Sequence, residues 1–263
     1  MKLAHKKKKI FLIAAALITI IYLGSVLFVR TSYNLQRILG KGNFSKDTNS
    51  QTLSTPEVFT KVANEKYYVS SIEIPLSNMA VSAKIVEEYE KWLKDSGILN
   101  IKTEKDAEKA GLSDTKKYEY TASFKVYDTD KYISYVYEII TDTRGAHPNT
   151  YHTIFNFRKS DGKEIVAITD LYLDNVYETL SKLARSNLRT QFMENERFVE
   201  SLDEMTGEMF ISGTEAKPEN FSKFYFKDKN TMTIVFDKYA IGPYSIGDWG
   251  ADISLYSIKK LLR

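Results

Sequence analysis

Two histidines that lie five positions apart, His147 and His152, are the residues of this chain best suited to metal ligation or acid–base chemistry. Imidazole is a common zinc ligand, and the nearby carboxylate of Asp142 could supply a third ligand. However, His147 falls in a segment typical of a loop, and His152 falls in a strand pattern. No helical or hairpin spacing brings the three side chains to one point. We therefore expect these residues to cap a turn or to fill a half-buried position, without a metal.

The sequence contains no clear motif for other kinds of catalysis. The chain contains no cysteine, which excludes disulfides, thiolate metal sites and a cysteine nucleophile. A serine–histidine–aspartate triad has no supporting nucleophile-elbow sequence. The sequence cannot identify a pair of carboxylates for glycoside cleavage, because sequence spacing does not fix the separation of about 5–9 Å that such enzymes need. We expect no catalytic residues and no cofactor.

Two glycine- and proline-marked segments, residues 144–149 and 239–250, are too irregular to be ordinary strands. In one interpretation, Gly145 and Gly242 permit unusual backbone angles and the prolines stiffen the loops. In the other, the two loops form one exposed aromatic surface that binds a glycan or a protein. The candidate ligand-binding residues are Arg144, Gly145, His147, Pro148, Asn149, Tyr239, Gly242, Tyr244, Gly247 and Trp249.

The hydrophobic periodicity beyond residue 57 predicts an α+β fold, with antiparallel sheets and packed helices in two sub-domains at residues 58–158 and 159–263. Alternation and turn residues predict strands over 67–74, 118–126, 133–139, 151–157, 164–168, 223–226 and 231–236. Residues 128–130 are predicted to form a hairpin turn between the second and third of these strands. Helical spacing predicts a helix that Ser77 caps and Gly97 ends, and a second helix that Asp174 or Asn175 caps. We expect residues 193–209 to be helical in part, and residues 253–262 to form a short strand or helix.

The first 57 residues have the pattern of a membrane anchor and a stalk. Residues 10–29 are uncharged and long enough, at about 30 Å, to span a bilayer. Five lysines precede them, so the positive-inside rule keeps residues 1–9 in the cytoplasm and places the rest outside. A cleaved signal peptide is the competing interpretation, but no clear cleavage site follows the apolar run. The polar residues 30–57 are typical of a flexible stalk.

Charge argues against a nucleic-acid partner. The chain has a net charge of +3, and removing the five N-terminal lysines leaves −2 for the remainder. The predicted exported part therefore has no excess of positive charge to attract a phosphate backbone. The basic tract is better explained as a topology signal.

Several motifs resemble those of a known exported module. They are Gly-Ala-His-Pro-Asn at 145–149, Asp-Gly-Lys at 161–163, Ile-Thr-Asp-Leu-Tyr at 168–172 and Asp-Lys-Tyr-Ala-Ile-Gly-Pro-Tyr-Ser-Ile-Gly at 237–247. Residues 60–263 resemble a two-part module of unknown function. It is shared by the ectodomain of the lysozyme-sensing anti-sigma factor of Gram-positive bacteria and the N-terminal part of a membrane-anchored peptidoglycan deacetylase. The resemblance implies a binding domain, with lysozyme as the partner in the anti-sigma example.

Two departures from these relatives limit what the resemblance implies. The predicted cytoplasmic tail, residues 1–9, is too short for a helix that holds a sigma factor. The chain also reaches Arg263 without a catalytic domain after the module. We therefore expect a single-pass protein of the cytoplasmic membrane, with its C-terminal domain outside, that binds a lysozyme-like protein or peptidoglycan and is not an enzyme. The alternatives are a cell-wall hydrolase or deacetylase with an unrecognised site, and an accessory subunit of an envelope enzyme.

Overall fold

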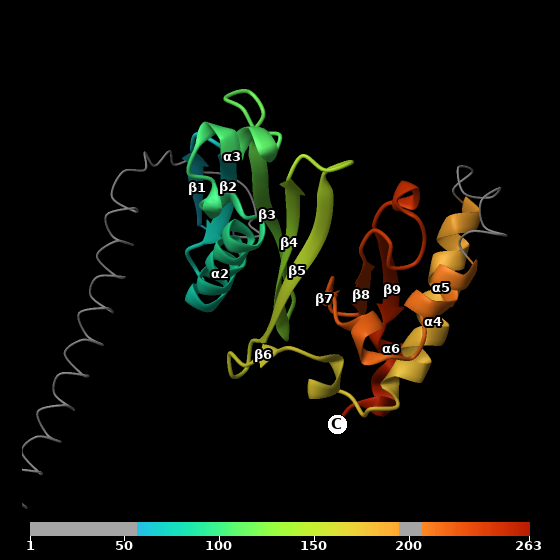
Figure 1. Ribbon diagram of the computed structural model, residues 1–263. Helices are drawn as coiled ribbons and strands as arrows, with labels where there is room; N and C mark the ends of the chain where they lie inside the picture. Colours follow the sequence, from blue (N-terminus) through green and yellow to red (C-terminus); the bar gives the residue numbers. More distant parts are fainter. Residues whose placement is uncertain (1–56, 195–206) are drawn as a thin grey trace, which may run out of the picture. The chain divides into compact units, whose positions relative to one another are not determined.

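The computed structural model describes residues 57–194 and 207–263 (Figure 1). Pro56–Arg263 form one compact unit. The predicted cytoplasmic tail, membrane anchor and stalk lie outside the described residues, apart from Glu57 at the end of the stalk. Within the part that is described, no helix is both long and apolar enough to cross a membrane. The topology therefore stays a prediction.

The first half of this unit forms a six-stranded sheet whose strands follow one another in chain order. The hairpin predicted around residues 128–130 is confirmed, because β3 and β4 pair antiparallel on either side of that turn. The predicted α+β fold with antiparallel sheets is confirmed, except that β2 and β3 pair in parallel. The strands are β1 (Val58–Asn64), β2 (Tyr68–Pro75), β3 (Tyr118–Asp128), β4 (Tyr132–Asp142), β5 (Asn149–Arg158) and β6 (Glu164–Ile165).

The parallel pair requires a crossover, and α2 (Met79–Asp95) with α3 (Glu104–Lys109) provides it. The cap of α2 is Asn78 and not Ser77, because the Asn78 side chain accepts hydrogen bonds from the next backbone N–H groups, at 3.1 and 3.2 Å. Gly97 follows the helix with a φ of 70°, as its predicted role at the C-terminal end requires.

The second half forms a three-stranded antiparallel sheet with a long helix beside it (Figure 1). Its strands are β7 (Phe224–Phe226), β8 (Thr231–Phe236) and β9 (Trp249–Ser254). Its α-helices are α4 (Val176–Glu194), α5 (Gly207–Gly213) and α6 (Leu255–Ile258). Short 3-10 helices complete the fold: η1 (Ile98–Asn100), η2 (Ile168–Asp170), η3 (Pro218–Phe221), η4 (Tyr244–Ile246) and η5 (Lys259–Leu261).

Each sheet buries one face against helices. On the first sheet, Tyr120, Tyr137 and Phe155 belong to a core that also contains Val81 and Ile85 of α2. On the second sheet, alternate residues of β8 and β9 share a core with the apolar side of α4. Because successive side chains of a strand point to opposite faces, the second face of each sheet can contact the neighbouring sheet.

The two sheets are joined by a buried polar network where β7 contacts the strands of the first sheet. The Ser134 hydroxyl donates to Asn156 Oδ1 at 2.7 Å, and Asn156 Nδ2 donates to the Phe224 carbonyl at 2.8 Å. The Phe226 N–H donates to the Ser134 oxygen at 3.1 Å. Ser134 and Asn156 are buried, so these bonds satisfy backbone groups of β7 that water does not reach.

The predicted boundaries fail at two places. The strand expected over 164–168 has only two residues, because the chain turns into η2 at Ile168, where the Asp170 carboxylate accepts the N–H groups of Val166 and Ala167. Trp249 and Gly250, expected in an irregular loop, open β9 and pair with Phe236 and Val235. The division into sub-domains at residue 158 stays a prediction.

Candidate functional site

The two predicted loops meet in the structure, although about ninety positions separate them in the sequence. The His147 ring stacks on the Tyr244 ring, with centroids 3.8 Å apart and planes at 30°. The Tyr244 hydroxyl donates to the Pro148 carbonyl at 3.1 Å, and the Tyr239 hydroxyl lies 3.3 Å from His147 Nε2. We call residues 144–149 and 239–247 the loop pair. It contains four of the candidate residues in direct contact: His147, Pro148, Tyr239 and Tyr244.

The hydrogen bonds of His147 define which nitrogen carries a proton. Nδ1 lies 3.0 Å from the Pro148 carbonyl, which can only accept, so Nδ1 donates. In the neutral ring Nε2 then accepts from the Tyr239 hydroxyl. Both residues are exposed, and 53% of Tyr239 is open to solvent. The loop pair therefore presents pre-positioned aromatic rings at the surface.

Each loop holds one non-glycine residue in the left-handed backbone region: Arg144 at a φ of 59° and Tyr239 at a φ of 67°. Such residues cost about 1–3 kcal/mol and persist where the surroundings fix them, often at functional sites. The expectation that Gly145 and Gly242 take these angles is wrong, because neither has a positive φ. Among the candidate glycines a positive φ is found at Gly247, at 79°.

Arg144 supports its loop and does not extend toward a ligand. Its N–H donates to Asp142 Oδ1 at 2.7 Å, and its guanidinium bonds Glu119, Asp142 and the Lys117 carbonyl. These contacts fix the left-handed turn. The three side chains weighed as metal ligands, His147, His152 and Asp142, are engaged elsewhere. Asp142 pairs with Arg144, His147 contacts Tyr239 and Tyr244, and His152 pairs with Asp237.

Trp249 lies apart from the aromatic contacts of the loop pair. Its indole N–H donates to the Ile246 carbonyl at 2.9 Å, and its ring meets Phe192 of α4 edge-on at 4.3 Å. The remaining candidates, Gly145, Asn149 and Gly242, make no side-chain contribution to the contacts described: Asn149 opens β5 as an exposed residue, and Gly242 is buried.

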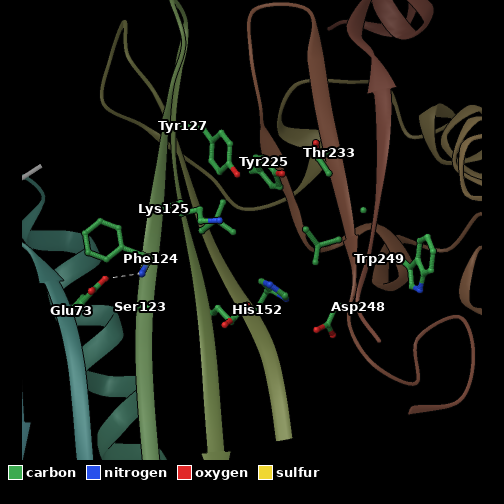
Figure 2. A pocket seen from close by; sticks show the side chains of 14 residues that line it. Glu73, Ser123, Phe124, Lys125, Tyr127, His152, Tyr225, Thr233, Asp248 and Trp249 are labelled. Atoms are coloured by element: carbon green, nitrogen blue, oxygen red, sulfur yellow. Dashed lines mark hydrogen bonds between the residues drawn. The ribbon is translucent and has the colours of Figure 1, made fainter. Parts of the chain in front are cut away.

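A groove of about 500 Å³ lies between the facing sheets (Figure 2). On the first sheet, Ser123, Glu138 and His152 are cross-strand neighbours and form one polar row. Tyr127 and Tyr225 pair across the groove, with ring centroids 4.4 Å apart. Burial raises the pKa of Tyr225 to about 12, so its hydroxyl stays protonated near neutral pH. The lining also includes Glu73, Lys125, Thr233, Asp248 and Trp249.

At one side of the groove, His152 meets the carboxylate of Asp237, which directly follows β8 of the second sheet. His152 Nδ1 lies 2.7 Å from Asp237 Oδ1, and the His152 backbone N–H donates to the same carboxylate at 3.1 Å. Lys223 forms an ion pair with the other Asp237 oxygen. Burial alone would raise the pKa of Asp237, but the hydrogen bonds and charges of His152 and Lys223 outweigh it and hold the pKa below its usual value.

Asp248 completes this cluster. One of its oxygens accepts the Lys238 N–H at 2.9 Å and so ties together the two ends of the 238–248 loop. Figure 2 shows Asp248, which directly precedes β9, near His152 of β5. Sequence reasoning missed this cluster. Asp237 lies just before the glycine- and proline-marked segment 239–250 and Asp248 lies within it, which was the available signal, but nothing in the spacing linked them to His152.

Comparison with known protein families finds one match, which lies in the second half of the unit. Residues 169–256 match the family model described as "Protein of unknown function (DUF3298)". This segment holds Tyr239, Tyr244, Asp237 and Asp248, while His147 and His152 precede it. None of the curated proteins compared with the chain matches it. The match supports the predicted resemblance to a domain of unknown function.

Two solved structures of DUF3298 family proteins are similar to this chain in fold. One, from Bacteroides fragilis, is 16% identical with a TM-score of 0.52, covering 80% of this chain and 94% of its own. The other, from Pseudomonas aeruginosa, is 14% identical with a TM-score of 0.54, covering 79% and 93%. At such low identity the likeness concerns the fold alone. It extends well beyond the segment that the family model matches.

Proposed function

We propose that this protein is a membrane-anchored, extracytoplasmic binding module that recognises a lysozyme-like protein or peptidoglycan through the loop pair, without signalling to a sigma factor. The observation that carries the proposal is the stacking of His147 on Tyr244 at 3.8 Å. Two segments far apart in sequence converge there on one exposed aromatic surface. The lysine-flanked apolar run at residues 10–29 supports the anchor and its direction.

The loop pair has the physical properties of a prepared binding surface. Its backbone is held in place by the contacts of Arg144 with Glu119 and by the hydrogen bond from the Lys238 N–H to Asp248. Because the rings are held before a ligand arrives, little conformational entropy is lost on binding. Aromatic rings with polar tips suit both partners: they stack on sugar faces, and they anchor protein interfaces. The resemblance to the lysozyme-sensing module adds weight to a protein partner.

An envelope hydrolase or deacetylase is the second candidate, and one observation favours it. Asp237 holds His152 through Nδ1, and His152 lines the groove beside Glu138 and Asp248. A carboxylate-oriented imidazole is a common general base. This alternative predicts the release of acetate or reducing ends from purified peptidoglycan, lost in His152→Ala.

A pull-down tests the binding proposal. The fragment Pro56–Arg263 is a compact unit with its own cores, so it is immobilised and offered lysozyme or insoluble peptidoglycan. We expect retention of one of them, with loss in Tyr239→Ala. Tyr256→Ala is the matched control, because Tyr256 is a tyrosine that is 84% exposed and lies on α6. Retention of neither partner would contradict the proposal.

A further inference from the structure

The cluster at the side of the groove combines the donor atoms of a metal site. One nitrogen or oxygen from each of His152, Asp237 and Asp248 lies within 4.8 Å of the other two, and all three side chains are half-buried. Donor atoms around one zinc ion lie within about 4 Å of each other, since each is about 2.0–2.2 Å from the metal. A small side-chain adjustment therefore brings the three to coordination distance.

We propose that His152, Asp237 and Asp248 bind one divalent transition-metal cation, with its open coordination positions facing the groove. One imidazole and two carboxylates suit zinc or manganese better than calcium, which prefers a full shell of oxygen ligands. Three protein ligands beside a groove are the arrangement of sites that keep a position for water or a ligand. This departs from the expectation of no metal, which weighed His147, His152 and Asp142 as the ligands and did not consider Asp237 or Asp248.

The surroundings of the carboxylates fit this role. Lys223 engages Asp237 Oδ2, whereas Oδ1 faces His152. The Lys238 N–H holds Asp248 through Oδ1. Metal-binding carboxylates are commonly hydrogen-bonded by such outer groups, which orient them. Lys223 therefore holds Asp237 in place and also offsets part of the negative charge when the site is empty of metal.

The groove determines what a bound cation would meet. Both His152 and Asp248 line it, and Glu138 is the direct cross-strand neighbour of His152. The open positions would accept an oxygen of a ligand in the groove, such as a hydroxyl or a carboxylate. The site shares no residue with the loop pair, although Asp248 also anchors the loop that carries Tyr239 and Tyr244. Metal binding is therefore measured separately from the proposed binding function.

Calorimetric titration of the untagged, chelator-treated fragment Pro56–Arg263 with Zn²⁺ tests the site, and the absorption spectrum of added Co²⁺ reports on the ligand set. The fragment contains two histidines, His147 and His152, which provide a matched pair. We expect one ion per chain, with affinity reduced at least about tenfold in His152→Gln and in Asp248→Asn, and unchanged in His147→Gln. Asp248→Asn keeps an oxygen for the Lys238 N–H, so it should fold even where His152→Gln does not.

Three results of these titrations would overturn the proposed metal site. Less than one ion per wild-type chain would overturn the proposal, as would binding that Asp248→Asn leaves unchanged. Equal losses in His147→Gln and His152→Gln would indicate adventitious surface binding and would also overturn it. Circular dichroism and the Tm of each variant show whether the fold is kept.

Discussion

His152 and Asp237, which are 85 positions apart, are joined by hydrogen bonds from both the side chain and the backbone of His152. Nδ1 lies 2.7 Å from Oδ1, and the backbone N–H lies 3.1 Å from Oδ1 and 3.3 Å from Oδ2. His152 belongs to β5 of the first sheet, and Asp237 directly follows β8 of the second. Together with the Ser134–Asn156 network, this pair connects the two sheets on either side of the groove. It also fixes the start of the loop that carries Tyr239 and Tyr244.

Removing Asp237 should weaken the whole unit. Asp237→Ala leaves the Lys223 ammonium and the His152 backbone N–H without their partner, and 15% of the Asp237 side chain is exposed. We expect the free energy of unfolding to fall by about 2–4 kcal/mol, as for partly buried ion pairs. Urea denaturation of Pro56–Arg263 measures this. Asp174→Ala, which removes an ion pair to Arg263 at a carboxylate that is 84% exposed, should cost less than about 1 kcal/mol.

Asp237 should also make stability depend on pH. Its pKa is lower in the folded protein than its ordinary value of 3.8, so the folded state binds this proton less readily than the unfolded state. The stabilisation is therefore complete above the unfolded pKa and is lost as the pH falls through the folded pKa. Unfolding free energies measured from about pH 5 down to about pH 2 should fall more steeply for the wild type than for Asp237→Asn. Parallel curves would show that Asp237 does not contribute.

Among the polar residues between the sheets, we expect substitution of Asn156 to lower the free energy of unfolding most. Asn156→Ala removes the acceptor of the Ser134 hydroxyl and the donor to the Phe224 carbonyl, both buried. Unsatisfied buried groups cost about 1–3 kcal/mol each, so we expect a loss of about 2–4 kcal/mol in urea denaturation. Asn149→Ala, an exposed change on the same strand, should lie within about 0.5 kcal/mol of the wild type.

Tyr239→Gly should separate stability from binding. Glycine adopts the left-handed angle without strain, which relieves about 1–2 kcal/mol and offsets the loss of the hydroxyl contact to His147. We expect the Tm to stay unchanged or to rise, while affinity for the envelope ligand falls by about tenfold or more. A variant that loses stability and binding together would mean that the ring supports the loop and does not contact a ligand.

Gly213, at the end of α5, lies so close to Ala240 of the loop pair that no side chain fits there. A Cβ built on Gly213 would lie 1.8 Å from the Ala240 carbonyl oxygen, whereas one on Gly145 would meet nothing within 4 Å. Gly213→Ala should therefore displace the 239–247 loop and lower the Tm by several degrees, at about 1–3 kcal/mol. Gly145→Ala is the control and should leave the Tm unchanged. An unchanged Tm in Gly213→Ala would show that the loop shifts without cost.

The sequence was most informative where one face of a strand is buried. Alternation at Tyr118–Val126 and Ile133–Ile139 predicted β3, β4 and their hairpin, because their apolar positions face the α2 core. It did not predict the parallel pairing of β2 with β3, since alternation carries no strand direction. It also missed β1, an edge strand whose residues are exposed or half-buried and so carry little hydrophobic signal.

The candidate site was foreseen in part. Irregular composition marked both loops, and their aromatic residues do meet. Trp249 was assigned to the same surface because of its type, but its hydrogen bond to Ile246 and its contact with Phe192 direct it toward α4. The His152–Asp237 pair depends on which strand ends face each other across two sheets. That is a long-range relationship that no local pattern encodes.

The affinity of Pro56–Arg263 for lysozyme, and in parallel for soluble peptidoglycan fragments, tests the central proposal most directly. Calorimetric titration should give saturable binding of one of them, weakened about tenfold or more in His147→Ala and Tyr239→Ala and unchanged in Tyr256→Ala. Absence of saturable binding to either partner, or equal affinity in all four proteins, would contradict recognition through the loop pair.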